Sequence, residues 1–273
     1  MQLYFTNHEG FDLKPGDQVF IMDWNATGVV YIKRKEDGSE GGIYSASTGK
    51  LILKDEHYDD LIHVKGKTPI EGKFSYTNEY LAVVKDDKVG ACSMDGRLLL
   101  LTEYKDIMSY RNGLFIVKAW NNKYALYNDS GKLILPAKFN SMEWKNKNFV
   151  FASNRASTTV VASSGEILLE NARRTNITVS LGWQFFVYRK GDKFELYNIN
   201  GKVGEFSGRP RHMSCGYFEV TNGSRKYVVY AGDGSTVIPE GDYVSLKKMG
   251  MTIIAEDHDG NCTAIVVKEE KGK

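Results

Sequence analysis

The chain is poor in proline and cysteine, carries almost no net charge, and lacks long apolar runs. Its 273 residues include 5 prolines and 3 cysteines, and the formal net charge is +2. This balance removes the usual electrostatic argument for binding nucleic acid or an anionic membrane. The longest leucine run, Leu98–Leu101, is far shorter than the roughly 20 apolar residues of a membrane-spanning helix. We therefore expect no nucleic acid and no membrane among its partners.

The cysteines point to a reducing compartment. Cys92, Cys215 and Cys262 form no CxxC pair and no cluster with the spacing of metal ligands. Isolated cysteines in odd number are typical of reducing conditions, and Met1–Glu9 does not read as a signal peptide. These features predict free thiols, no metal or other cofactor, and a cytoplasmic location. A leader removed before Met1 remains the alternative.

Glycine and aromatic residues are abundant, and their arrangement favours strands. The chain has 27 Gly, 16 Tyr, 13 Phe and 4 Trp. No window of helical length repeats its apolar residues every 3.6 positions, whereas short apolar runs alternate with glycine-containing turns. We predict an all-β fold with less than about one-tenth helix.

A repeat of roughly 35 residues runs through the sequence. The segments Lys123–Pro136, Lys193–Val203 and Lys226–Pro239 share a lysine, an apolar run, a polar turn ending in glycine and a second apolar run. Four successive spacings between turn glycines lie between 33 and 36 residues, which predicts a single repeat domain over residues 1–273. The turn glycines are Gly49, Gly96, Gly131, Gly165, Gly201 and Gly234, with weaker matches at Gly10 and Gly272.

Each repeat reads as a small antiparallel meander. Glycine after Asp, Ser or Asn suits a hairpin turn, because it accepts a positive φ. The strand after the turn is an apolar triplet, and the prolines Pro15, Pro136 and Pro239, five residues after a turn glycine, are expected to end it. A third strand such as Leu114–Val117 precedes each hairpin, and a short fourth strand such as Asp106–Ser109 is expected after the aromatic residue that follows the triplet. The triplets are Leu51–Leu53, Leu98–Leu100, Leu133–Leu135 and Ile167–Leu169.

The pattern resembles the WG β-repeat family, also called KWG repeats, over about residues 40–267. The segment Lys88–Ile107 is most similar to the motif, with Lys88-Val89-Gly90, a turn glycine, an apolar run and Tyr104. The tryptophan of the motif is missing from every copy, so the chain resembles a divergent member. The resemblance implies a bacterial protein of tandem β-repeats that mediates contacts with other proteins.

Two arrangements of the repeats are open. A closed, propeller-like ring of about seven units is favoured, because closure removes edge strands. In such a ring Gln2–Asn7 is expected to lie beside a strand of Thr252–Lys268, since both segments are apolar and rich in β-formers. The alternative is an open superhelical array, in which the terminal repeats need capping.

Candidate partner-binding residues fall in two groups. Arg173 and Arg209 each lie eight residues after a turn glycine, and with Arg174 and Arg211 they are candidates for contacting an acidic partner. Solvated loop charge is the simpler interpretation. Exposed tryptophan anchors many interfaces, so Trp24, Trp120 and Trp183 are further candidates, although packing between repeats is favoured.

Nothing in the sequence assembles a catalytic or metal site. Asp257–Asn261 resembles the start of a calcium loop but has no aligned distal ligand, so we interpret it as a turn. His57 and His63 flank Tyr58, yet other repeats have non-titrating residues there. We expect a non-catalytic scaffold, not an enzyme, that binds an unidentified protein. A carbohydrate-binding module and an enzyme using loop carboxylates or histidines are the alternatives.

Overall fold

The chain folds almost entirely into β-strands. The structure is a computed structural model that describes residues 18–21, 29–33, 42–45, 51–54, 60–70, 73–93, 97–179 and 184–267. These residues form 27 strands and one three-residue 3₁₀ helix, η1 (Arg174–Asn176). The prediction of an all-β fold with scarce helix is therefore confirmed for the described residues. None of their helices has the length and apolar character needed to cross a membrane.

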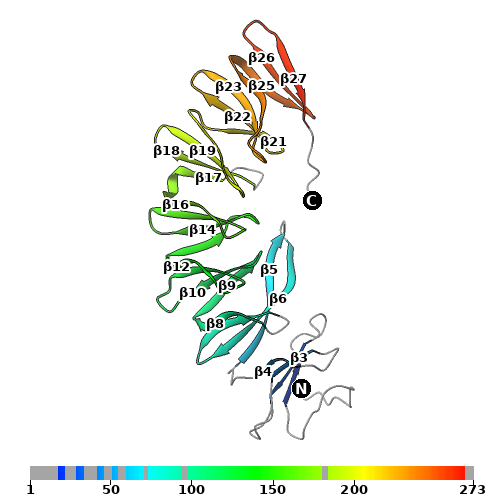
Figure 1. Cartoon of the computed structure of the whole chain (residues 1–273), viewed down its shortest axis with the longest axis vertical. Coiled ribbons are helices and arrows are strands. Elements are labelled where there is room, and N and C mark those ends of the chain that lie inside the picture. The colour runs from blue at the N-terminus through cyan, green and yellow to red at the C-terminus, as the bar shows by residue number, and fades with distance from the viewer. Residues whose placement is uncertain are drawn as a thin grey trace. The chain divides into compact units, whose positions relative to one another are not determined.

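The described strands form seven sheets, A to G in chain order, and each sheet is an antiparallel meander of consecutive strands (Figure 1). The chain divides into two compact units, Met1–Phe139 with sheets A to C and Asn140–Lys273 with sheets D to G. Sheet A contains β1 (Gln18–Ile21), β2 (Val29–Lys33), β3 (Gly42–Ser45) and β4 (Leu51–Lys54). Sheet B contains β5 (Asp60–Ile70), β6 (Lys73–Lys85), β7 (Lys88–Cys92) and β8 (Leu98–Tyr104). Sheet C contains β9 (Asp106–Arg111), β10 (Leu114–Lys118), β11 (Tyr124–Asn128) and β12 (Leu133–Phe139).

The second unit repeats this plan. Sheet D contains β13 (Ser141–Trp144), β14 (Phe149–Ser153), β15 (Ser157–Ala162) and β16 (Ile167–Arg173). Sheet E contains β17 (Ile177–Val179), β18 (Phe186–Lys190), β19 (Lys193–Asn198) and β20 (Gly201–Phe206). Sheet F contains β21 (Arg211–Ser214), β22 (Tyr217–Asn222), β23 (Arg225–Tyr230) and β24 (Thr236–Gly241). Among the described residues, sheet G contains β25 (Tyr243–Met249), β26 (Thr252–Asp257) and β27 (Cys262–Val266).

The repeat glycines lie between the third and fourth strands of their sheets. Gly131, Gly165 and Gly234 have φ of +76°, +89° and +79°, and Gly201 begins β20 with φ of +125°. These backbone angles explain why glycine recurs in the turn. The turn glycines Gly10, Gly49, Gly96 and Gly272 lie outside the described residues.

A β-bulge recurs in the fourth strand of all six four-stranded sheets. In β12, Leu133 pairs with Tyr127 and Leu135 pairs with Leu126, so Ile134 is an extra residue. An extra residue interrupts the alternation of faces in a strand, and the adjacent Leu99 and Leu100 are accordingly both buried. The bulge thus explains why an apolar triplet follows the turn. The extra residues are Ile52, Leu99, Ile134, Leu168, Val203 and Val237.

The structure corrects the expectation that proline ends the fourth strand. Pro136 lies inside β12 and Pro239 lies inside β24. Both strands lie at the edge of their sheets. Proline is tolerated there because its missing N–H removes no hydrogen bond between strands. Pro15 lies outside the described residues.

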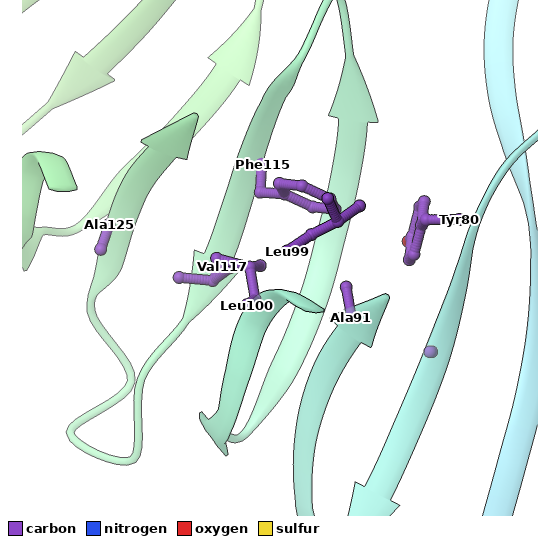
Figure 2. Packing of buried hydrophobic residues seen from close by; sticks show 8 residues of the cluster. Tyr80, Ala91, Leu99, Leu100, Phe115, Val117 and Ala125 are labelled. Atoms are coloured by element: carbon purple, nitrogen blue, oxygen red, sulfur yellow. The ribbon is translucent and has the colours of Figure 1, made fainter. Parts of the chain in front are cut away.

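Neighbouring sheets share apolar cores. Between sheets B and C, Tyr80, Leu99, Leu100 and Phe115 belong to one buried cluster (Figure 2). The rings of Tyr80 and Phe115 meet edge to face with centroids 5.2 Å apart. Equivalent clusters join sheets D and E, E and F, and F and G in the second unit. The strands therefore bury both faces, as in the adjacent Ala125 and Leu126.

We expect Gly90→Ala to lower the free energy of unfolding by about 2 kcal/mol. A Cβ at this position would lie 2.7 Å from the Leu100 carbonyl oxygen, because the bulged β8 passes close to β7. The measurement is urea unfolding of both proteins. Gly191→Ala is the control, because no atom lies within 4 Å of a Cβ at that position and only the φ of +61° disfavours a side chain. This variant should lower the free energy of unfolding by about 1 kcal/mol. Equal losses would show that Leu100 does not restrict position 90.

The arrangement of the ends stays a prediction. Gln2–Asn7, the segment expected to complete the last unit of a ring, lies outside the described residues. The closed ring and the open array therefore both stay predictions.

Candidate functional site

Trp120 lies in a loop that is fixed at several points. The loop joins β10 to β11 and turns at Asn122, whose φ is +59°. The indole N–H of Trp120 donates to the Glu103 carbonyl on β8 at 3.2 Å. Lys105 Nζ donates to Asn122 Oδ1 at 3.1 Å, and Asn121 Nδ2 donates to the Ala137 carbonyl at 3.3 Å. These bonds attach the loop to the fourth strand of sheet B and to that of its own sheet.

Trp120 and two leucines of β8 are exposed apolar residues. Trp120 is 52% exposed, Leu101 is 54% exposed and Leu98 is 50% exposed. Leu98 and Leu101 belong to β8, and Glu103, which anchors the Trp120 indole, follows two residues after Leu101. We name Leu98, Leu101 and Trp120 the β8 strip. The Trp120 indole thus bonds to the neighbouring sheet while about half of the side chain stays exposed.

Of the four candidate arginines, Arg173 and Arg209 share one repeat position, eight residues after the turn glycine. Arg173 ends β16 and Arg174 begins η1, in the link from sheet D to sheet E. Arg209 precedes β21 and Arg211 begins it, in the link from sheet E to sheet F. All four are exposed, and Arg211 lies 3.7 Å from Glu219 across β21 and β22. The structure shows where these arginines lie in the links between sheets, and no ligand is assigned to them.

Sheet E contains a charge cluster that sequence reasoning missed. Glu195 is only 3% exposed, although it carries a carboxylate. Its Oε1 lies 2.7 Å from Lys202 Nζ and 3.7 Å from Lys190 Nζ, and its Oε2 accepts a hydrogen bond from the Tyr197 hydroxyl at 2.8 Å. Lys202 also contacts Glu205 at 3.0 Å. We name Lys190, Lys193, Glu195, Lys202 and Glu205 the sheet E ion network.

Titration in this network follows from its contacts. Hydrogen bonds from Lys193 and Lys202 lower the pKa of Glu205 to about 2. The hydrogen bond to Glu195 raises the pKa of Lys202, and burial, with the hydrogen bond to Glu195, raises the pKa of Tyr197. Because the pKa of Glu205 is depressed in the fold, its ion pairs contribute stability that is lost as the pH falls from about 4.5 through about 2. Both carboxylates of the network are paired with lysines of sheet E.

One sequence signal could have found this network. Glu195 stands six residues before its turn glycine, where other repeats have Gly90, Ala125 and Thr159. A carboxylate at a place that is otherwise small and buried implies that it has partners. The lysines that supply them, Lys190 and Lys202, lie on the two strands that flank β19.

Asp257–Asn261 is a hairpin turn, as its sequence indicates. Asp257 Oδ1 accepts hydrogen bonds from the backbone N–H groups of Asp259 and Asn261, and Oδ2 accepts one from Asn261 Nδ2. These bonds lower the pKa of Asp257. Within the described part of the chain, no three His, Cys, Asp or Glu side chains gather in a way that could hold a metal ion.

Several other candidates lie beyond the described parts. Trp24, Trp183 and His57 are outside the described residues, and for His63 only the backbone of β5 is described. Cys215 and Cys262 are exposed free thiols, whereas Cys92 is buried.

Comparison with known proteins finds distant structural likeness alone. No family model matches the chain, and no curated protein matches it. BamB from Moraxella catarrhalis is similar over 90% of this chain and 81% of its own, with 10% identity and a TM-score of 0.24. Hsv2p of Kluyveromyces lactis covers 71% of this chain and 72% of its own, with 10% identity and a TM-score of 0.25. The WD40 β-propeller domain of Doa1 is similar over 77% of this chain and 86% of its own, with 13% identity and a TM-score of 0.24. At TM-scores this low the likeness carries no argument about overall shape or function.

Proposed function

We propose that this chain is a non-catalytic scaffold of the WG-repeat type that binds another protein in the cytoplasm. The observation that carries the proposal is the β8 strip, in which Trp120 is half exposed while its loop is fixed by three hydrogen bonds. Tryptophan is among the residues that contribute most to binding at protein interfaces. A side chain held in place before binding loses little conformational entropy when a partner covers it.

Exposed leucines on the strand that anchors Trp120 support a protein partner. Leu98 and Leu101 present apolar side chains on β8, the strand that anchors the indole. Contacts of this kind exclude water around a central aromatic anchor. The arginines of the second unit, Arg173, Arg174, Arg209 and Arg211, are candidates for additional contacts with acidic groups of a partner, where charge affects the rate of association.

The experiment is affinity capture from a lysate of the organism that encodes the chain, quantified by mass spectrometry. We expect the wild-type chain to enrich a specific protein and the double variant Trp120→Ala, Leu101→Ser to lose at least tenfold of that enrichment. The matched control is Val244→Ser, which changes a residue that is 49% exposed on β25, far along the chain. Circular dichroism checks that each variant remains folded. Equal capture by the double variant and the wild type would refute a role for the β8 strip.

A further inference from the structure

The segment that contains Trp120 is basic, although the whole chain is nearly neutral. Residues 97–139 include seven Lys or Arg and three Asp or Glu, which gives this segment a net charge of +4. The formal net charge of the chain is +2, so the rest of the chain is slightly acidic. The near balance of the whole chain therefore conceals a local excess of positive charge at the end of the first unit.

Three lysines of this segment lie at the Trp120 loop. Lys118 ends β10 and Lys123 directly precedes β11, so they flank the loop on its two strands. The backbone N–H of Lys105 donates to the Lys118 carbonyl oxygen at 2.9 Å, and the Lys105 ammonium group donates to Asn122 Oδ1 at 3.1 Å. The three lysines thus belong to the end of sheet C at which Trp120 is exposed.

A fourth lysine, Lys138, belongs to the same end of sheet C. The loop donates a hydrogen bond to the carbonyl oxygen of Ala137, the residue before it, and Lys138 itself is exposed. Two acidic residues are also present, Glu103 at the end of β8 and Asp106 at the start of β9. Asp106 is paired with Lys118 in the register of β9 and β10. Lysines therefore outnumber acidic residues by four to two around the loop.

We propose that the β8 strip and these four lysines bind an acidic segment of another protein, one that also carries large apolar side chains. The inference rests on the proposed function and names the chemistry of the partner. Carboxylates of the segment pair with the lysines, and its apolar side chains cover the exposed part of Trp120. The aromatic anchor supplies most of the affinity. The complementary charge speeds association and rejects basic partners.

An anionic membrane offers the same charge but fits the acidic residues less well. A continuous layer of anionic headgroups attracts the lysines, yet it also repels Glu103 and Asp106. A peptide segment can place its carboxylates beside the lysines and its neutral residues beside the two acidic ones. The mixed charge around the loop therefore favours a protein segment.

Selection from a random peptide library displayed on phage tests this chemistry. The full wild-type chain and the Trp120→Ala chain serve as separate baits, and the peptides that only the wild type retains are sequenced. We expect these peptides to be acidic and to contain large apolar residues. Neutral or basic peptides would overturn the inference and leave the β8 strip as a binding site. If no peptide depends on Trp120, the inference fails, and capture from the lysate still tests the proposed function separately.

Charge reversal tests whether the lysines contact the peptide. An acidic peptide from the selection is labelled, and its Kd is measured by fluorescence anisotropy. Lys118→Glu combined with Lys138→Glu should raise the Kd at least about tenfold. Arg225→Glu combined with Lys247→Glu is the control, because it changes the net charge equally at two exposed residues of the second unit. Equal effects of the two pairs would assign the loss to total charge and overturn the inference.

Two further measurements use the unaltered chain as well as variants that circular dichroism shows to be folded. Added sodium chloride should raise the Kd of the wild type for the peptide, because salt screens exposed charges. A Kd that does not change with salt would contradict the pairing of lysines with carboxylates. The wild type should not sediment with phosphatidylcholine vesicles that contain phosphatidylserine. Sedimentation that Trp120→Ala abolishes would assign the surface to a membrane instead.

Discussion

Phe186→Ala is expected to lower the free energy of unfolding by about 3–5 kcal/mol, the largest effect of any single change considered. Phe186 on β18 is fully buried between sheets D and E. Its ring meets Phe149 edge to face at 5.3 Å and stacks on Tyr197 at 4.7 Å with an interplanar angle of 3°. Truncation removes both ring contacts and leaves a cavity that the paired strands on either side cannot close. Urea unfolding followed by tryptophan fluorescence measures the loss.

Two variants separate this cavity effect from general sensitivity to mutation. Phe186→Leu keeps most of the volume and should cost less than about 1.5 kcal/mol. Ile199→Ala changes a side chain that is 40% exposed in the turn after β19 and should stay within about 0.5 kcal/mol of the wild type. A loss below about 1 kcal/mol for Phe186→Ala would show that the core between sheets D and E does not depend on this ring.

Lys202→Met is expected to cost about 2–3 kcal/mol, because it leaves the buried Glu195 carboxylate without its nearest cation. The remaining partners are the Tyr197 hydroxyl at 2.8 Å and Lys190 at 3.7 Å, and Lys190 is largely exposed. The expected cost is below that of a fully buried pair, since the Lys202 side chain is 39% exposed and water screens part of the interaction. Urea unfolding at neutral pH is the measurement.

A double variant identifies the cause of that loss. If an unpaired buried charge is responsible, adding Glu195→Gln to Lys202→Met should restore at least half of the stability, because the amide carries no charge. Lys193→Met is the control, since it removes only the exposed partner of Glu205 and should cost less than about 0.5 kcal/mol. Failure of the double variant to recover would assign the loss to the packing of the Lys202 side chain.

The repeat could be predicted from the sequence because the residues that form its turns are adjacent in the chain. A turn glycine between apolar runs specifies a hairpin by its own backbone angle, and Gly131 and Gly165 adopt that angle. The strand before each hairpin follows from the same spacing, as β10 shows. The expected short fourth strand Asp106–Ser109 is present as β9, but it is the first strand of the next sheet.

The features that sequence reasoning missed depend on neighbours far along the chain. In the sequence, the bulge of the fourth strand corresponds to an apolar triplet after the turn glycine. Such a triplet alone does not distinguish a bulged strand from a regular strand that is buried on both faces. The exposure of Trp120 is decided by the strand β8, about 17 residues earlier in the chain, which supplies its hydrogen-bond acceptor. The repeat position of Glu195 implies that it has partners but does not identify its lysines, because these lie on the strands on either side of it.

The recurring bulge also bears on how such a chain avoids association with itself. Every four-stranded sheet ends in a fourth strand, so the described fold presents six such edges that could template the strands of another molecule. The bulge breaks the regular ladder of each edge at the same point, and Pro136 and Pro239 remove a donor from two of them. A motif that packs the core on one side of the fourth strand therefore makes the outer edge of that strand a poor template for a strand of another molecule.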